Sequence, residues 1–118
     1  MLVLALGAWL APGAALAEND MCDGRTAQSA AAELAMSPGP KVVRVLIKLK
    51  TPGGADRAAL DRDSSALAET LKRAGAYSAA PIGGQPLVVA ELDKERLVEV
   101  AKDPRVACIT QDVPGKAY

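Results

Sequence analysis

The chain has 118 residues, half of them hydrophobic, with 14 Lys and Arg against 14 Asp and Glu and with no His or Phe. This length allows one domain at most. The balanced charge gives no general field that would attract nucleic acid or an anionic membrane. Without His, neither a Ser-His-Asp nor a Cys-His site can form within the chain, so we expect no enzyme activity.

The first residues have the pattern of an export signal. Residues 2–16 are almost all apolar and uncharged, and they are too short to span a bilayer comfortably. They end in Ala15-Leu16-Ala17, the small-x-small pattern that a signal peptidase cuts. We therefore predict that residues 1–17 are a signal peptide cleaved after Ala17 and that the protein is secreted or periplasmic. The first basic residue is only Arg25, which leaves open a start further upstream, and membrane contact is expected only through an uncleaved leader.

The two cysteines of the chain, Cys22 and Cys108, both remain after this cleavage. In an exported protein a single pair is interpreted first as a disulfide. Closing so long a loop would stabilise the fold by about 3–4 kcal/mol in the chain-entropy model. The alternative is a pair of unpaired thiols, with Cys108 as a small apolar residue of a strand.

The next elements follow from apolar spacing and turn residues. Residues 18–40 are predicted to be an N-terminal tether with room for a short helix at 30–36, ended by Ser37-Pro38-Gly39-Pro40. Residues 42–50 alternate between apolar and basic side chains, which predicts a strand buried on one side. Its buried face would carry Val43, Val45, Ile47 and Leu49. Residues 56–74 predict a helix that ends at Gly75, with a weak point at residues 63–65.

The remaining pattern completes a fold class. It predicts a short strand at 76–80, a turn at 82–86 and an apolar strand at 87–92. Asp93 then caps a helix that ends before Pro104, and residues 105–111 form the last strand. With right-handed crossovers, this order predicts an α+β, ferredoxin-like βαββαβ fold, an antiparallel sheet with both helices on one face.

The second half of the chain carries a family pattern. A strand at 87–92 leads through the cap Asp93 into a short helix, followed by Asp103-Pro104-Arg105-Val106 and then Ile109-x-x-Asp112. In this order and spacing the chain resembles the subtilisin propeptide family of protease inhibitors over about residues 41–118. The resemblance implies a propeptide-inhibitor-like domain at 41–112 and a subtilisin-like serine protease as partner.

The end of the chain extends this resemblance. Bacterial subtilisin prodomains are similar in finishing on Ala-Tyr, and this chain ends Lys116-Ala117-Tyr118. The resemblance implies that the helix-free sheet face packs on the protease and that the tail lies in the substrate groove like a product. Tyr118 would fill the primary specificity pocket, with Ala117, Lys116 and Gly115 in the next subsites. The whole inhibitory tail would be Val113, Pro114, Gly115, Lys116, Ala117 and Tyr118.

The chain also departs from the family. Two acidic residues near the last strand contact the protease in the prodomains; Asp112 matches one, but Thr110 stands at the place of the other. Gly115 falls where a hydrophobic side chain usually anchors the tail. Both departures predict weaker or differently targeted binding. No protease sequence follows Tyr118, so we expect an inhibitor, or a folding chaperone, that acts in trans.

Other chemistry is set aside on the residues. Cys22 and Cys108 are not the closely spaced cysteines that metal-transfer domains of this fold need, and the Gly83-Gly84 turn lacks the helix of a phosphate loop. The acidic pairs Asp61/Asp63 and Glu91/Asp93 are interpreted as solvated surface. We therefore expect no cofactor, no metal and no small-molecule substrate. The apolar run Val106–Ile109 is unusual for a strand with one wet face, so its second face is covered by the tether, awaits a partner or tolerates water. The alternative function is a non-inhibitory, ferredoxin-like interaction module of the cell envelope.

Overall fold

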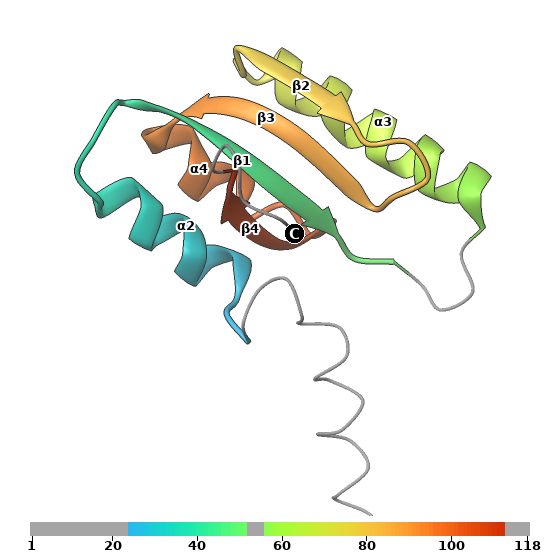
Figure 1. Cartoon of the computed structure of the whole chain (residues 1–118), viewed down its shortest axis with the longest axis horizontal. Coiled ribbons are helices and arrows are strands. Elements are labelled where there is room, and N and C mark those ends of the chain that lie inside the picture. Colours follow the sequence, from blue (N-terminus) through green and yellow to red (C-terminus); the bar gives the residue numbers. More distant parts are fainter. Residues whose placement is uncertain (1–23, 52–55, 113–118) are drawn as a thin grey trace, which may run out of the picture.

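A computed structural model describes residues 24–51 and 56–112, as Figure 1 shows. The expected signal peptide, Cys22 and the expected tail at 113–118 lie outside these residues. The elements are, in chain order, α2 (Ala27–Met36), β1 (Val42–Leu49), α3 (Arg57–Arg73), β2 (Ser78–Pro81), β3 (Leu87–Asp93), α4 (Lys94–Val100) and β4 (Val106–Gln111). Within the described ranges, none of the helices has the length and apolarity needed to cross a membrane.

The four strands form the predicted antiparallel sheet. Its order is β2-β3-β1-β4, with β1 paired to both β3 and β4 and with β2 paired to β3. Neighbours in the sheet that are not neighbours in the chain require crossovers, and α3 and α4 supply them (Figure 1). The prediction of an α+β, ferredoxin-like arrangement is confirmed.

Alternation along the strands separates the two faces of the sheet. The predicted buried face of β1 is confirmed, because Val43, Val45, Ile47 and Leu49 all belong to the core. Their partners on β3 that share this face are Val88, Ala90 and Leu92. Leu67 and Leu71 of α3 and Leu97 of α4 close the core from the helical side. Burying each large aliphatic side chain contributes roughly 1.5–3 kcal/mol, so this face supplies most of the stability.

Helix α3 covers almost the whole predicted range of 56–74 and is more regular than the sequence suggests. The Asp56 carboxylate accepts a hydrogen bond from the Ala59 amide at 2.8 Å and so caps its first turn. The helix then runs without interruption through residues 63–65, so the predicted weak point is wrong. Gly75 follows with a φ of 105°, as predicted for a left-handed helix end.

The expected tether contains a helix that belongs to the core. Helix α2 begins after Thr26, whose side chain accepts a hydrogen bond from the Ser29 amide at 3.0 Å. It is longer than the short helix expected at 30–36, and Ala27 and Ala31 are part of the core cluster. The helix lies alongside α4 and β4. Residues 27–36 are therefore a structural element rather than a tether.

The junctions around β3 and β4 explain two remaining sequence features. Asp93 precedes α4 as predicted, but its side chain makes no capping bond and instead accepts from the Tyr77 hydroxyl at 3.2 Å. In β4 the pairing shifts register between Lys48 and Leu49 of β1. Because of this bulge, Val106 and Ile109 both reach the core. The run of apolar residues in β4 thus follows from an irregular strand.

Candidate functional site

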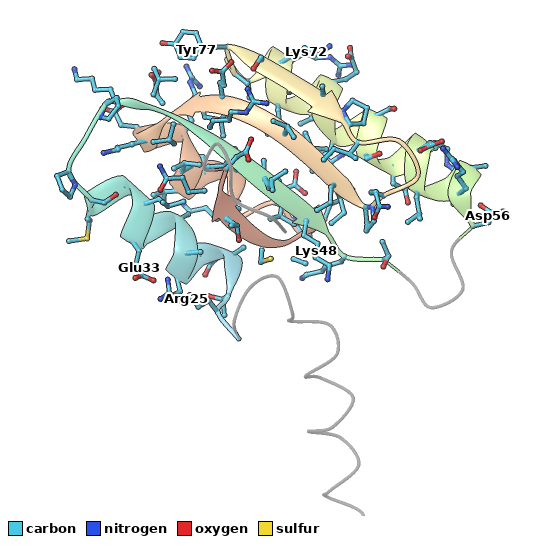
Figure 2. The ribbon with its side chains drawn as sticks, in the orientation of Figure 1. Arg25, Glu33, Lys48, Asp56, Lys72 and Tyr77 are labelled. Atoms are coloured by element: carbon cyan, nitrogen blue, oxygen red, sulfur yellow. The ribbon has the colours of Figure 1, made fainter. Side chains whose placement is uncertain are left out.

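The face of the sheet opposite the core is the candidate partner-binding surface, and we call it the outer face. Tyr77, just before β2, and Lys48, near the end of β1, lie toward opposite ends of the sheet (Figure 2). By strand register, the outer face consists of Val42, Arg44, Leu46 and Lys48 of β1, Leu87, Val89, Glu91 and Asp93 of β3, Ser78 and Ala80 of β2, and Cys108 and Thr110 of β4.

Four polar side chains cross the outer face in one line, which we call the polar row: Ser78, Glu91, Arg44 and Asp112. The Ser78 hydroxyl donates to Glu91 Oε1 at 2.8 Å, and Arg44 Nε donates to Asp112 Oδ2 at 2.7 Å. Arg44 stands directly opposite Glu91 in the β1–β3 register. The row therefore places one guanidinium between two carboxylates, each supplied by a neighbouring strand or by the residue that follows it.

An apolar line runs beside the polar row. Its apolar residues are Ala80, Val89 and Leu46, and it ends at Thr110; these four are consecutive partners across the sheet. Leu46 is only 5% exposed although it lies on the outer face, whereas Ala80 is exposed and Val89 is half-buried. A polar line beside an apolar one provides both orientation and apolar contact, the combination typical of protein interfaces.

The two residues predicted to face a protease, Thr110 and Asp112, both belong to this face. Thr110 is half-buried opposite Leu46 in the apolar line. Asp112 ends the polar row, where its carboxylate is engaged by Arg44 and its amide donates to the Arg44 carbonyl at 2.9 Å. The acidic side chain expected to reach a partner is thus already held by the protein itself.

The tail and the disulfide are not placed by the described residues. Val113 to Tyr118 lie outside them, and their insertion into a protease stays a prediction. Cys108 is completely buried and lies opposite Lys48, on the outer face. Its predicted partner Cys22 lies outside the described residues, so the disulfide also stays a prediction.

The start of β4 is fixed by the Asp103-Pro104-Arg105 junction. Asp103 Oδ1 accepts from the Arg105 amide at 2.8 Å, and the Arg105 guanidinium donates to both Asp103 oxygens at 3.0 and 2.7 Å. The Arg105 side chain holds the pKa of Asp103 below its ordinary value. The Val106 amide then donates to the Asp103 carbonyl at 3.0 Å. This turn gives a physical reason for the Asp-Pro-x-Val spacing, because it sets the point where β4 begins.

The acidic side chains set aside in the sequence have structural roles. Asp61 Oδ1 accepts from the Gly84 amide at 2.6 Å, so it anchors the β2–β3 turn to α3 and is not simply solvated. Glu91 and Asp93 accept from the Ser78 and Tyr77 hydroxyls. Among the residues that the structure describes, no three His, Cys, Asp or Glu side chains come together as a metal site would require.

The sequence missed the roles of Arg44 and Glu91. Alternation places Arg44 on the wet face of β1, where a basic residue is ordinary. Its contact with Asp112 joins residues 68 positions apart, so only the pairing of β1 with β4 reveals it. The signal available in the sequence was the residue type alone.

Comparison with protein families, with curated proteins and with solved structures finds no match for this chain.

Proposed function

We propose that this protein is an exported inhibitor of subtilisin-like serine proteases. It binds through the outer face and inserts residues 113–118 into the active-site groove as a product-like peptide. The proposal takes its target from the sequence resemblance to subtilisin propeptides and its docking surface from the geometry of the sheet.

The position of Asp112 is the observation that carries the proposal. Strand β4 is an edge strand whose regular pairing ends at Gln111, yet Asp112 is still bonded to Arg44 through its amide and its carboxylate. The predicted tail therefore begins one residue beyond a fixed point on a sheet edge. A peptide that starts from a fixed point loses less conformational freedom on binding than one that hangs from a loose segment.

The outer face supports the same function. Ala80 and the half-buried Val89 of its apolar line offer contact area, and the polar row offers charged groups at fixed positions near one end of the sheet. The helices that complete the core lie against the opposite face, so a partner on the outer face leaves the core contacts intact.

Deleting Lys116-Ala117-Tyr118 tests the proposal. The full-length protein is expected to inhibit a subtilisin, and the shortened protein to lose that inhibition because the primary specificity pocket stays empty. The measurement is the inhibition constant against the subtilisin, followed by cleavage of a chromogenic peptide substrate. Circular dichroism confirms that both proteins are folded. A Gln85→Ala variant, changed at an exposed position of the β2–β3 turn, is the control and should inhibit normally.

Undiminished inhibition by the shortened protein would refute the inserted tail. A wild-type protein that inhibits no subtilisin would favour the alternative of a non-inhibitory interaction module. That alternative has its own support, because the polar groups of the row already satisfy one another. Recovery of activity when a denatured protease is refolded with this protein would instead indicate a chaperone in trans.

A further inference from the structure

We infer that Arg44 is the positioning residue for the C-terminal tail: it fixes the direction in which the chain leaves β4. This inference rests on the proposed function. Arg44 belongs to the outer face, and the role inferred for it is to hold Asp112, apart from any direct contact with the protease.

Arg44 holds Asp112 by two independent contacts. Its carbonyl accepts from the Asp112 amide at 2.9 Å, which extends the β1–β4 ladder one residue past Gln111. Its Nε donates to Asp112 Oδ2 at 2.7 Å. Two contacts to one residue, one through the backbone and one through the side chain, restrict both the position and the rotation of Asp112. A charge-assisted bond of this kind is stronger than a neutral one.

The surroundings keep Arg44 in this orientation. The Asp112 side chain is only 22% exposed, so its bond to Arg44 is partly shielded from water. Glu91 faces Arg44 from the other neighbouring strand, and the Ser78 hydroxyl holds Glu91 in turn. Carboxylates on both sides thus attract the guanidinium into the polar row. A lysine would keep the charge but not the planar donor geometry.

The consequence concerns the tail. Val113 is bonded covalently to Asp112, so restricting Asp112 restricts the starting direction of residues 113–118. A tail whose first residue is restricted before binding loses less conformational entropy when it enters a groove. Losing the contact between the Arg44 and Asp112 side chains should therefore raise the rate at which the complex with the protease dissociates, while the domain stays folded.

The chain offers a matched control at the other end of the same strand. Arg105 pairs with Asp103 at 2.7 Å, the same separation as in the Arg44–Asp112 pair. The acidic partners are similarly shielded, with the Asp103 side chain 20% exposed. The Arg105 pair fixes the start of β4, whereas the Arg44 pair fixes the end that leads to the tail.

The experiment compares Arg44→Met, Arg44→Lys, Arg105→Met and the wild type. Met keeps the apolar stem of arginine and removes its donors, and Lys restores only the charge. For each protein we would measure the inhibition constant and dissociation rate against a subtilisin. Thermal unfolding and the hydrogen-exchange rate of the Asp112 amide would be measured on the free proteins.

Arg44→Met is expected to inhibit about tenfold more weakly than the wild type, mainly through faster dissociation. The reason is the entropic cost of fixing a few more rotatable bonds when the variant's tail binds. Its Asp112 amide should exchange faster; weaker inhibition with an unchanged exchange rate would assign the loss to direct contact between Arg44 and the protease and would overturn the positioning role. Arg44→Lys should lie between the two, and Arg105→Met should inhibit like the wild type even if it unfolds at a lower temperature. Undiminished inhibition by Arg44→Met, or equal losses in Arg44→Met and Arg105→Met, would overturn the role of Arg44. A wild-type protein that does not inhibit at all is a different result, which refutes the proposed function and the role of Arg44 within it.

Discussion

Ser64 is the only polar or charged residue among those described that is buried from water, and its hydroxyl is satisfied within its own helix. It donates to the Leu60 carbonyl at 2.8 Å, one turn earlier in α3. Serine lowers helix propensity because its side chain competes for backbone groups, which is why the sequence suggested a break. Here the same side chain bonds back to the helix, and the helix continues.

Replacing this serine should therefore matter little. Ser64→Ala removes a hydroxyl whose partner, the Leu60 carbonyl, belongs to the helical ladder, and alanine is the better helix former. We expect the free energy of unfolding to change by less than about 1 kcal/mol. Ser64→Leu should cost roughly 1–3 kcal/mol because Ser64 is completely buried and a larger side chain would overpack its surroundings. Urea unfolding followed by circular dichroism measures both changes. A loss above about 2 kcal/mol in the free energy of unfolding for Ser64→Ala is on the scale of an unsatisfied buried group and would show that the hydroxyl has a further role.

Other residues show where sequence reasoning stops. The placement of Val45 and Ile47 in the core follows from alternation alone. The placement of Leu46 does not, because an apolar residue on the wet side of a strand signals nothing until its neighbours Val89 and Thr110 are known. Pairings between strands distant in the chain decide such positions, and a single sequence does not display them.

Among the elements, α2 differs most from its prediction. Its buried residues are all alanines, Ala27, Ala30 and Ala31, and its remaining positions include further alanines. Such a helix has little contrast between its faces, so hydrophobic periodicity barely registers. The local signal that was present is Thr26, a good N-cap residue. The small size of the alanines allows the helix to lie close beside α4 and β4.

A pair of neighbouring variants tests whether α2 is part of the core. Ala31 is completely buried, and the next residue, Ala32, is exposed. Ala31→Glu places an unpaired charge at a completely buried position, and we expect a loss of at least about 3 kcal/mol in the free energy of unfolding. Ala32→Glu should change it by no more than about 0.5 kcal/mol. Chemical denaturation compares the two, and equal stabilities would mean that α2 is dispensable to the fold.

The strands were easier to predict than this helix because they alternate. β1 has four core residues separated by charged or outer-face residues, and β3 repeats that pattern. β4 departs from alternation through its bulge, which the sequence shows only as an unexplained apolar run. Regular elements with contrasting faces were therefore predicted, whereas irregular or low-contrast elements were not.

At the scale of the molecule, element order was sufficient for the topology because right-handed crossovers leave few alternatives. The candidate site was only partly predictable. The sequence selected Thr110 and Asp112 through the family resemblance, but the partners of these residues, Leu46 and Arg44, come from β1. A site assembled across strands requires the register, and the register requires the fold.

The dependence of stability on pH tests how the Asp103–Arg105 pair, at the junction of α4 and β4, supports the whole domain. The Arg105 side chain lowers the pKa of Asp103, so the folded protein binds a proton at this carboxyl less readily than the unfolded chain does. The Asp103 charge therefore stabilises the fold above the unfolded pKa of about 4, and this contribution is lost as the pH falls through the lower folded pKa. Asp103→Asn retains an oxygen for the Arg105 amide but removes the charge.

We expect Asp103→Asn to unfold at a lower temperature than the wild type at pH 7, and the difference to shrink as the pH is lowered below about 4. Thermal unfolding followed by circular dichroism from pH 7 to pH 2.5 measures this gap. A gap that stays constant across the range would assign the loss to altered turn geometry instead of charge. A difference in unfolding temperature that shrinks at low pH would show that the ion pair at the start of β4 supports the cooperative stability of the domain. The reason is that the α4–β4 junction joins the helical layer to the edge strand that precedes the predicted tail.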